Sequence, residues 1–137
     1  GICYAANAKP GATTVTARFA SSSSYRRILV HEYQGVATTN PLDVTAGRIA
    51  NGTTVANNIS SGSVTTTAAG DLVFVAVMDA AGTATITAGT GYTLRATTSS
   101  DIGSEDRVLP TAGAVTGTFT FSAAHRYLIS IVTFKAG

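Results

Sequence analysis

The stretch Leu72-Val73-Phe74-Val75-Ala76-Val77-Met78 is the longest unbroken apolar run in this chain of 137 residues. Its valines favour a strand over a helix, and its alternating positions are apolar on both faces. We therefore expect a strand that is covered on both sides, in the middle of a β-sheet protein. The run falls far short of the roughly 20 residues that a membrane-spanning helix needs, so no membrane partner is expected.

The composition extends the β assignment to the rest of the chain. Threonine supplies 23 residues and glycine 14, whereas Glu and Lys occur only twice each. β-Branched residues suit a pleated surface, and glycine is frequent in turns. Charged residues make up 12% and the formal net charge is +2, which excludes a self-repelling disordered chain and a strongly basic nucleic-acid-binding protein.

Segments with strand character recur along the chain between clusters of Gly, Ser, Asn or Pro. Two of them flank Gly89-Thr90-Gly91, which predicts a hairpin. The residues from Gln34 to Ser63 form a long connection, which is either functional or hides a short edge strand. The further expected strands are Ile2–Ala6, Thr14–Phe19, Arg27–Tyr33, Thr83–Ala88, Tyr92–Thr97, Val115–Phe121 and Tyr127–Phe134.

About nine or ten closely spaced strands predict two stacked antiparallel sheets. The expected fold is an all-β, two-sheet β-sandwich of the jelly-roll or immunoglobulin-like kind, formed by one domain over residues 1–137. The chain opens without an initiator Met and strand character begins at Ile2, so we expect upstream strands to be missing. Low charge, Ser/Thr-rich turns and few lysines are typical of exported bacterial modules, so we expect the protein to be secreted. Cys3 is the single cysteine, and we expect a free, half-buried thiol.

No catalytic motif is complete. No serine lies in a G-x-S-x-G elbow, and His31-Glu32 is followed by Gly35 where a zinc protease has its second histidine. A glycosidase with two facing carboxylates is the weakest alternative, because most acidic residues fall at loop or strand ends. We therefore expect a protein without enzymatic activity.

The acidic residues offer one weak metal site. Asp101, Glu105 and Asp106 lie together in a predicted polar loop, and Ca²⁺ prefers such hard oxygen ligands. Arg107 follows directly and favours a simple salt bridge instead. A structural Ca²⁺ ion at these three residues is therefore the only cofactor considered.

Tyrosine is the residue type that suggests a ligand. The ring of a tyrosine at a strand end can stack on a sugar, while neighbouring polar groups bind the sugar hydroxyls. Alternatively, such a ring is buried and only its hydroxyl reaches water. The glycan interpretation therefore requires several rings on one outward surface. The candidate residues are Tyr33, Gln34, Tyr92 and Tyr127, followed by Tyr25 and Arg26.

Three stretches carry a family resemblance: Arg27–Val36 (RILVHEYQGV), Ala69–Val73 (AGDLV) and Ile131–Lys135 (IVTFK). They are similar to a β-sandwich domain that recurs in secreted multimodular proteins of soil bacteria, over nearly the whole chain. Such domains usually have additional strands before the segment that corresponds to Tyr4–Phe19, and they resemble carbohydrate-binding modules. The resemblance implies secretion and polysaccharide binding, with no catalytic residues carried over.

Two functions follow from these observations. The first is a non-catalytic carbohydrate-binding module for plant-type β-glucan, that is, β-1,4-linked glucan of the cellulose or xyloglucan class. The alternative is a structural or adhesive surface or filament module that assembles through an exposed sheet edge. The two functions predict different partners: a polysaccharide, or another copy of the chain.

Overall fold

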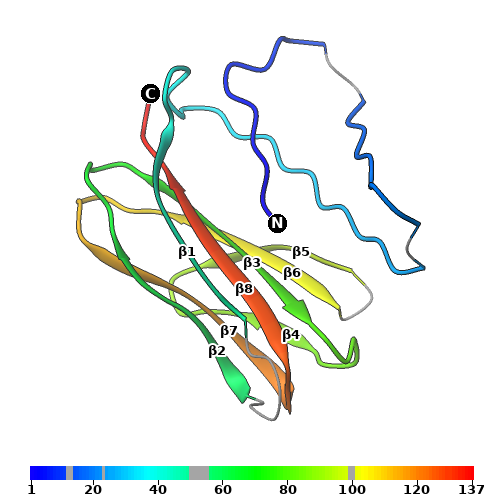
Figure 1. Ribbon diagram of the computed structural model, residues 1–137. Coiled ribbons are helices and arrows are strands. Elements are labelled where there is room, and N and C mark those ends of the chain that lie inside the picture. The colour runs from blue at the N-terminus through cyan, green and yellow to red at the C-terminus, as the bar shows by residue number, and fades with distance from the viewer. Residues whose placement is uncertain (12–13, 23, 50–55, 99–100) are drawn as a thin grey trace.

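The computed structural model describes residues 1–11, 14–22, 24–49, 56–98 and 101–137. Within these ranges the chain forms eight strands in two antiparallel sheets, as a β-sandwich does, which confirms the predicted all-β class (Figure 1). One sheet has the order β1-β8-β3-β6-β5 and the other β2-β7-β4. The strands are β1 (Leu42–Ile49), β2 (Ala56–Thr65), β3 (Leu72–Asp79), β4 (Ile86–Ala88), β5 (Thr93–Thr98), β6 (Ile102–Val108), β7 (Ala114–His125) and β8 (Tyr127–Phe134).

Strand β3 is the centre of the five-stranded sheet, as its apolar run predicts. It pairs with β6 on one side and with β8 on the other. Val73, Val75 and Val77 face the second sheet, whereas Leu72 and Phe74 face the opposite, outer side. The described part of the chain contains no helix of the length and apolar character that crossing a bilayer requires.

The inner core lies between the two sheets. Phe119 and Phe121 of β7 project into it and are each 1% exposed. Gly117 shares their face, and a Cβ atom at that position would lie 2.5 Å from Cγ1 of Val75. The strand predicted at Val115–Phe121 is therefore present with one face in the core, and Gly117 marks a point where the two layers approach closely.

The predicted hairpin around Gly89-Thr90-Gly91 is wrong. β4 pairs with β7 in the smaller sheet, whereas β5 pairs with β6 in the larger sheet. The turn that joins them is therefore a crossing between layers, closed by a hydrogen bond from Tyr92 N to Gly89 O. Local alternation identifies a strand but does not select its partner, which explains the error.

Three strands were not expected. β1 and β2 occupy much of the long connection between Gln34 and Ser63, where the sequence suggested at most one short edge strand. Both are edge strands, of 8 and 10 residues. β6 occupies the segment that was expected as an acidic loop. Its sequence, IGSEDRV, has no apolar face that would predict a strand. Its polar residues are nevertheless buried, because segments distant in the chain cover them.

The described residues between 1 and 35, hereafter the arm, contain no strand. The strands expected at Ile2–Ala6, Thr14–Phe19 and Arg27–Tyr33 are therefore not formed, because no neighbouring segment supplies a hydrogen-bonded ladder for them. Figure 1 shows the arm in blue beside the five-stranded sheet, on the side away from the smaller sheet. Cys3 is exposed rather than half-buried.

The arm packs on a second apolar cluster, which lies on the outer face of the five-stranded sheet. Leu72 and Phe74 of β3 and Val132 and Phe134 of β8 form this outer cluster. Ile2, Tyr33 and Val36 pack against it, and the Tyr4 ring meets Phe134 edge-on at a centroid distance of 5.2 Å. The arm thus covers part of a sheet face that would otherwise be open to water.

Candidate functional site

Polar and aromatic side chains meet where the arm crosses the outer face of the sheet. His31 and Tyr33 alternate along the extended arm, and their rings lie 5.1 and 6.2 Å from the Phe74 ring. Ser104 and Asp106 alternate along β6 and face the arm from below. The period of two in each extended segment brings these side chains together.

Asp106 is the centre of this group. Its Oδ2 accepts a hydrogen bond from the Tyr33 hydroxyl at 2.6 Å, and both carboxylate oxygens accept from Arg95 at 2.8 Å. Burial disfavours the ionised form, but the hydrogen bonds from Arg95 and Tyr33 outweigh it and lower the pKa of Asp106. Burial, followed by the bond to Asp106, raises the pKa of Tyr33. The cluster is therefore a carboxylate held by a guanidinium and a neutral phenol.

His31 lies beside a serine. Its Nε2 is 3.1 Å from Ser104 Oγ, and burial lowers the pKa of the imidazole, so the ring is neutral near pH 7. A serine next to a neutral histidine resembles a nucleophile and its base. Ser104 is fully buried, however, and among the described residues no carboxylate hydrogen-bonds the other nitrogen of His31. The contact therefore serves to attach the arm to the sheet.

An open depression of about 340 Å³ lies above this cluster. Its volume falls in the range of small-ligand sites, and it combines ring faces with hydrogen-bonding groups. It brings together Tyr33 and Gln34, two of the residues predicted from the sequence, with Arg95, which the sequence reasoning missed because nothing local marks it. The lining residues are His31, Glu32, Tyr33, Gln34 and Arg95.

The other predicted residues lie elsewhere. Tyr127 is 7% exposed and belongs to the inner core, so its ring is not available to a ligand and that assignment is wrong. Tyr92 is partly buried, and its hydroxyl donates to Thr116 O at 2.9 Å across the two sheets. Burial and the nearby Glu105 raise the pKa of Tyr92 to about 12.

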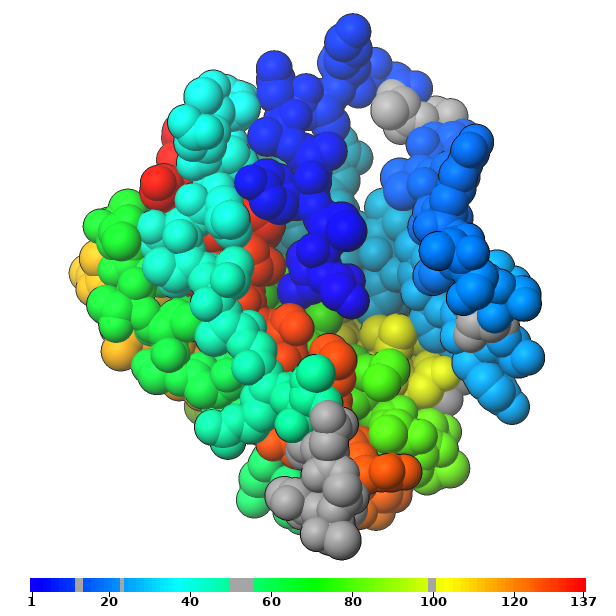
Figure 2. Space-filling model, viewed as in Figure 1, coloured from blue at the N-terminus to red at the C-terminus, as the bar shows by residue number. Residues whose placement is uncertain are grey.

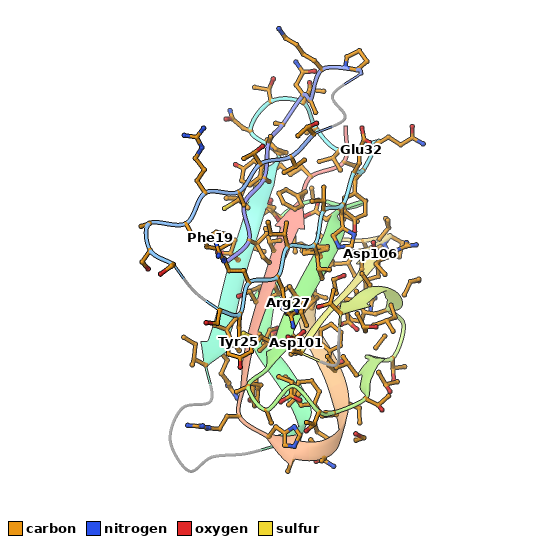
Figure 3. All side chains as sticks on the ribbon, turned by 90° about the vertical axis from the view of Figure 1, so that its right-hand side faces the viewer. Phe19, Tyr25, Arg27, Glu32, Asp101 and Asp106 are labelled. Carbon is orange, nitrogen blue, oxygen red and sulfur yellow. The ribbon has the colours of Figure 1, made fainter. Side chains whose placement is uncertain are left out.

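Tyr25 and Arg26 lie on the arm. Tyr25 is 85% exposed, and the Arg26 guanidinium lies 5.5 Å from the centre of the Phe19 ring. Figure 3 labels Tyr25 and Phe19 on the arm, apart from Asp106 of β6. The predicted tyrosines therefore do not share one outward-facing surface, because Tyr127 is interior and Tyr33 and Tyr92 are tied to the sheets.

The predicted calcium ligands are also separated. Glu105 and Asp106 are consecutive in a strand, so Glu105 points between the sheets while Asp106 points outward. Asp101 lies in the turn before β6 and forms an ion pair with Arg27, with Oδ2 2.9 Å from Nη2 (Figure 3). Within the described ranges no group of three or more His, Cys, Asp or Glu is placed to hold a metal ion, so this assignment is wrong.

His125, the second histidine, contacts other residues than His31 does. His125 Nδ1 lies 3.0 Å from both carboxylate oxygens of Asp79, at the end of β3. Asp79 also accepts hydrogen bonds from the backbone N–H groups of Ala81, Thr83 and Ala84. This carboxylate therefore orders the turn after β3.

The arm also carries most of the exposed apolar surface. Of the eleven large hydrophobic side chains that are exposed in the described structure, six belong to the arm. They are Tyr4 (51%), Val15 (68%), Phe19 (49%), Tyr25 (85%), Ile28 (51%) and Val30 (59%). Ile28 and Val30 alternate with the sheet-facing His31 and Tyr33, so they point away from the sheet. Figure 2 shows an open gap between the two limbs of the arm.

Comparison with protein families, with curated proteins and with solved structures finds no match for this chain.

Proposed function

We propose that this chain is a structural or adhesive module that assembles with a second copy of itself through the arm. The observation that supports it is the state of the arm, whose extended segments have no ladder partner among the described residues and whose apolar side chains are exposed. Large exposed apolar patches mark interaction surfaces in soluble proteins.

The backbone of the arm adds a directional element to this surface. Extended segments with free N–H and C=O groups are templates for strand addition, in which backbone hydrogen bonds supply affinity and alternate side chains supply specificity. Fully burying one large aliphatic or aromatic side chain stabilises a complex by about 1.5 to 3 kcal/mol before entropic costs. Val15, Phe19, Ile28 and Val30 are available for such burial.

A second copy fits this surface because the segment Thr14–Phe19 is complementary to itself. In an antiparallel pair with Ala17 opposite Ala17, Val15 lies opposite Phe19, and Thr16 lies opposite Arg18. Apolar residues then share one face and polar residues the other. A slip of one residue places Val15 opposite Arg18, which is unfavourable, so the pattern selects one register of a twofold contact.

Sedimentation velocity over a range of about 1 to 100 μM protein tests this proposal, because self-association depends on concentration. The wild type is expected to form a dimer or larger assembly, and the double variant Val15→Asp, Phe19→Asp is expected to be a monomer. Val108→Asp is the matched control, since Val108 is 63% exposed but lies outside the arm. A wild-type monomer at every concentration would exclude the proposal, and loss of assembly in the control would assign it to another surface.

A second candidate function is supported by the depression beside the arm. Tyr33, Gln34 and Arg95 line it together with Glu32 and His31, a combination of rings and polar groups that suits a sugar residue. Secretion and binding of a plant-type β-glucan remain proposals here, supported by the resemblance described above. The depression admits a single sugar unit or a chain end rather than a row of stacked sugars.

Affinity electrophoresis in gels that contain soluble β-1,4-glucan, xyloglucan or mannan tests this second function. We expect retardation in one of them, with Kd between about 1 μM and 1 mM. Gln34→Ala and Glu32→Ala are expected to reduce it, whereas Asn57→Ala, an exposed change on β2, should leave it unaltered. Equal mobility in all gels would exclude glycan binding while leaving the assembly proposal untouched.

A further inference from the structure

Asp71, directly before β3, is buried without a hydrogen-bond donor. Its exposed fraction is 0%, and neither carboxylate oxygen accepts a hydrogen bond from an N–H or hydroxyl donor of the described residues. Burial, followed by a hydrogen bond shared with the Asp43 carboxyl group, raises the pKa of Asp71 to about 6. An ionised carboxylate that is removed from water is strongly destabilising unless a positive group or several donors compensate it. An ionised Asp71 therefore lacks the positive group or the hydrogen-bond donors that would stabilise its charge.

The group that Asp71 faces is another carboxyl group, that of Asp43 on β1. Asp43 accepts hydrogen bonds from Thr67 N, at 2.7 Å, and from the Thr67 hydroxyl. The Lys135 side chain is near enough to favour the ionised carboxylates, but it forms no ion pair with either of them in the described structure. Three oxygen-bearing side chains thus converge, and no basic side chain of the described ranges forms an ion pair with them.

The fold holds this arrangement firmly. β8 lies between β1 and β3, and Phe134 is the register partner of both Leu42 and Leu72. The residues next to that row, Asp43 and Asp71, are thereby brought to the same end of the sheet. The backbone of Asp71 is fixed by the hydrogen bond from Leu109 N to Asp71 O, and Gly70 precedes it with a positive φ of 82°.

We propose that Asp71, Asp43 and the Thr67 hydroxyl bind a calcium ion at this end of the sandwich. Carboxylate and hydroxyl oxygens are the ligands that Ca²⁺ prefers, and it accepts six to eight of them in flexible geometry. No thiol or imidazole belongs to the group, which disfavours zinc. Thr67 is exposed and Asp43 is partly exposed, so the ion has a route from solvent and water completes its coordination.

The site differs from the acidic cluster at Asp101, Glu105 and Asp106, whose side chains diverge. It also lies apart from the depression and from the exposed apolar face of the arm. The inference is therefore independent of both proposed functions. Two carboxylates and water give modest affinity, and we expect Kd of about 0.1 to 1 mM, as in extracellular calcium-binding modules.

Equilibrium dialysis with radioactive calcium, after removal of bound metal with a chelator, tests the proposal. The wild type is expected to bind about one Ca²⁺ per chain, and calcium at about 5 mM is expected to raise Tm by a few degrees. Magnesium at the same concentration should have a smaller effect. Asp71→Asn and Asp43→Asn should each weaken binding at least tenfold, and Asp101→Asn, which removes a surface ion pair, should not.

The outcomes separate calcium from its alternatives. If calcium neither binds nor shifts Tm, while Asp71→Asn raises Tm, the two carboxyl groups share a proton and the proposal is overturned. An equal calcium effect in the wild type and in both variants would place the ion elsewhere and also overturn it. Should Asp71→Asn fail to fold, Asp43→Asn provides the same comparison, because Asp43 is only partly buried.

Discussion

Glu105 and Asp106 are consecutive in β6 but have opposite chemistry. Glu105 points between the sheets, where its Oε2 accepts a hydrogen bond from Gly89 N at 2.8 Å and its Oε1 has no partner among the described groups. Burial raises the pKa of Glu105 to about 7, against the hydrogen bonds from the backbone N–H groups of Gly89 and Thr118. Asp106 points outward to Arg95 and stays ionised. One step along a strand therefore separates an acid whose pKa is raised by burial from an acid whose pKa is lowered by its hydrogen-bond partners.

Glu105 makes stability depend on pH. Its folded pKa, about 7, lies above the ordinary value of 4.5, so the unfolded chain releases this proton at lower pH than the folded chain does. Its contribution to stability is complete below pH 4.5 and is lost as the pH rises through about 7. The total loss is on the order of 3 kcal/mol.

Urea unfolding of Glu105→Gln between pH 4 and 9 checks this expectation. The variant should show a weaker fall in the free energy of unfolding above pH 5 than the wild type, because glutamine has no proton to release. Asp101→Asn is the control and should retain the wild-type slope. A wild-type slope in Glu105→Gln would show that this carboxyl group is not the source.

Gly117 sets the spacing between the two layers. In Gly117→Ala the new methyl group would lie 2.5 and 2.8 Å from the two γ carbons of Val75, so we expect a loss of about 1 to 3 kcal/mol. Gly113→Ala is the control, since a Cβ there has no atom within 4 Å.

The cause of that loss can be checked by thermal unfolding of a second pair of variants. Val75→Ala removes the two γ carbons that the new methyl group would meet. The double variant Val75→Ala, Gly117→Ala should therefore lose about 1 kcal/mol less stability than the two single losses added together. Strict additivity would show that the glycine is needed for its backbone rather than for close packing.

At the scale of elements, the arm differs from the strands in what holds it. The strands are held by continuous ladders, whereas the arm is attached by side chains, chiefly His31, Tyr33 and Tyr4. The ion pair between Arg27 and Asp101 also attaches the arm to the turn before β6. Segments held by few contacts open locally at low cost, so the arm is expected to detach before the sandwich unfolds.

Limited trypsin digestion measures this detachment, because Arg18, Arg26 and Arg27 lie in the arm. Tyr33→Phe removes the hydrogen bond to Asp106, worth about 1 kcal/mol, and should speed cleavage of the arm about fivefold. Tyr4→Phe keeps the ring contact with Phe134 and should change the rate little. Equal rates in the wild type and Tyr33→Phe would mean that cleavage does not require release at Tyr33.

Elements differed in how far their sequences revealed them. β3 and β8 consist mostly of apolar residues, and both were predicted within one residue of their observed bounds. β6 was missed, because its buried polar residues owe their burial to the arm and to the turn at Gly89. The depression itself was not predicted, although two of its five lining residues, Tyr33 and Gln34, are among the candidates named from the sequence. Arg95 joins them only through the pairing of β5 with β6.

At the scale of the whole molecule, assembly and stability are coupled. If arms pair between two copies, folding and association reinforce each other, and Tm rises with protein concentration. We expect a rise of a few degrees between about 1 and 100 μM for the wild type by differential scanning fluorimetry. Val15→Asp, Phe19→Asp should show a Tm independent of concentration, and a concentration-independent wild type would contradict pairing.

The amino-acid sequence alone predicts the β class, the central position of β3 and the apolar character of both faces of that strand. These properties depend on the period of two along a single strand, which each segment carries locally. The strand partners, the crossing at Gly89, the interior position of Tyr127 and the meeting of Asp43 with Asp71 are visible only in the folded chain. Those depend on contacts between residues far apart in the chain, and no local pattern specifies which distant group will neutralise, cover or expose a given side chain.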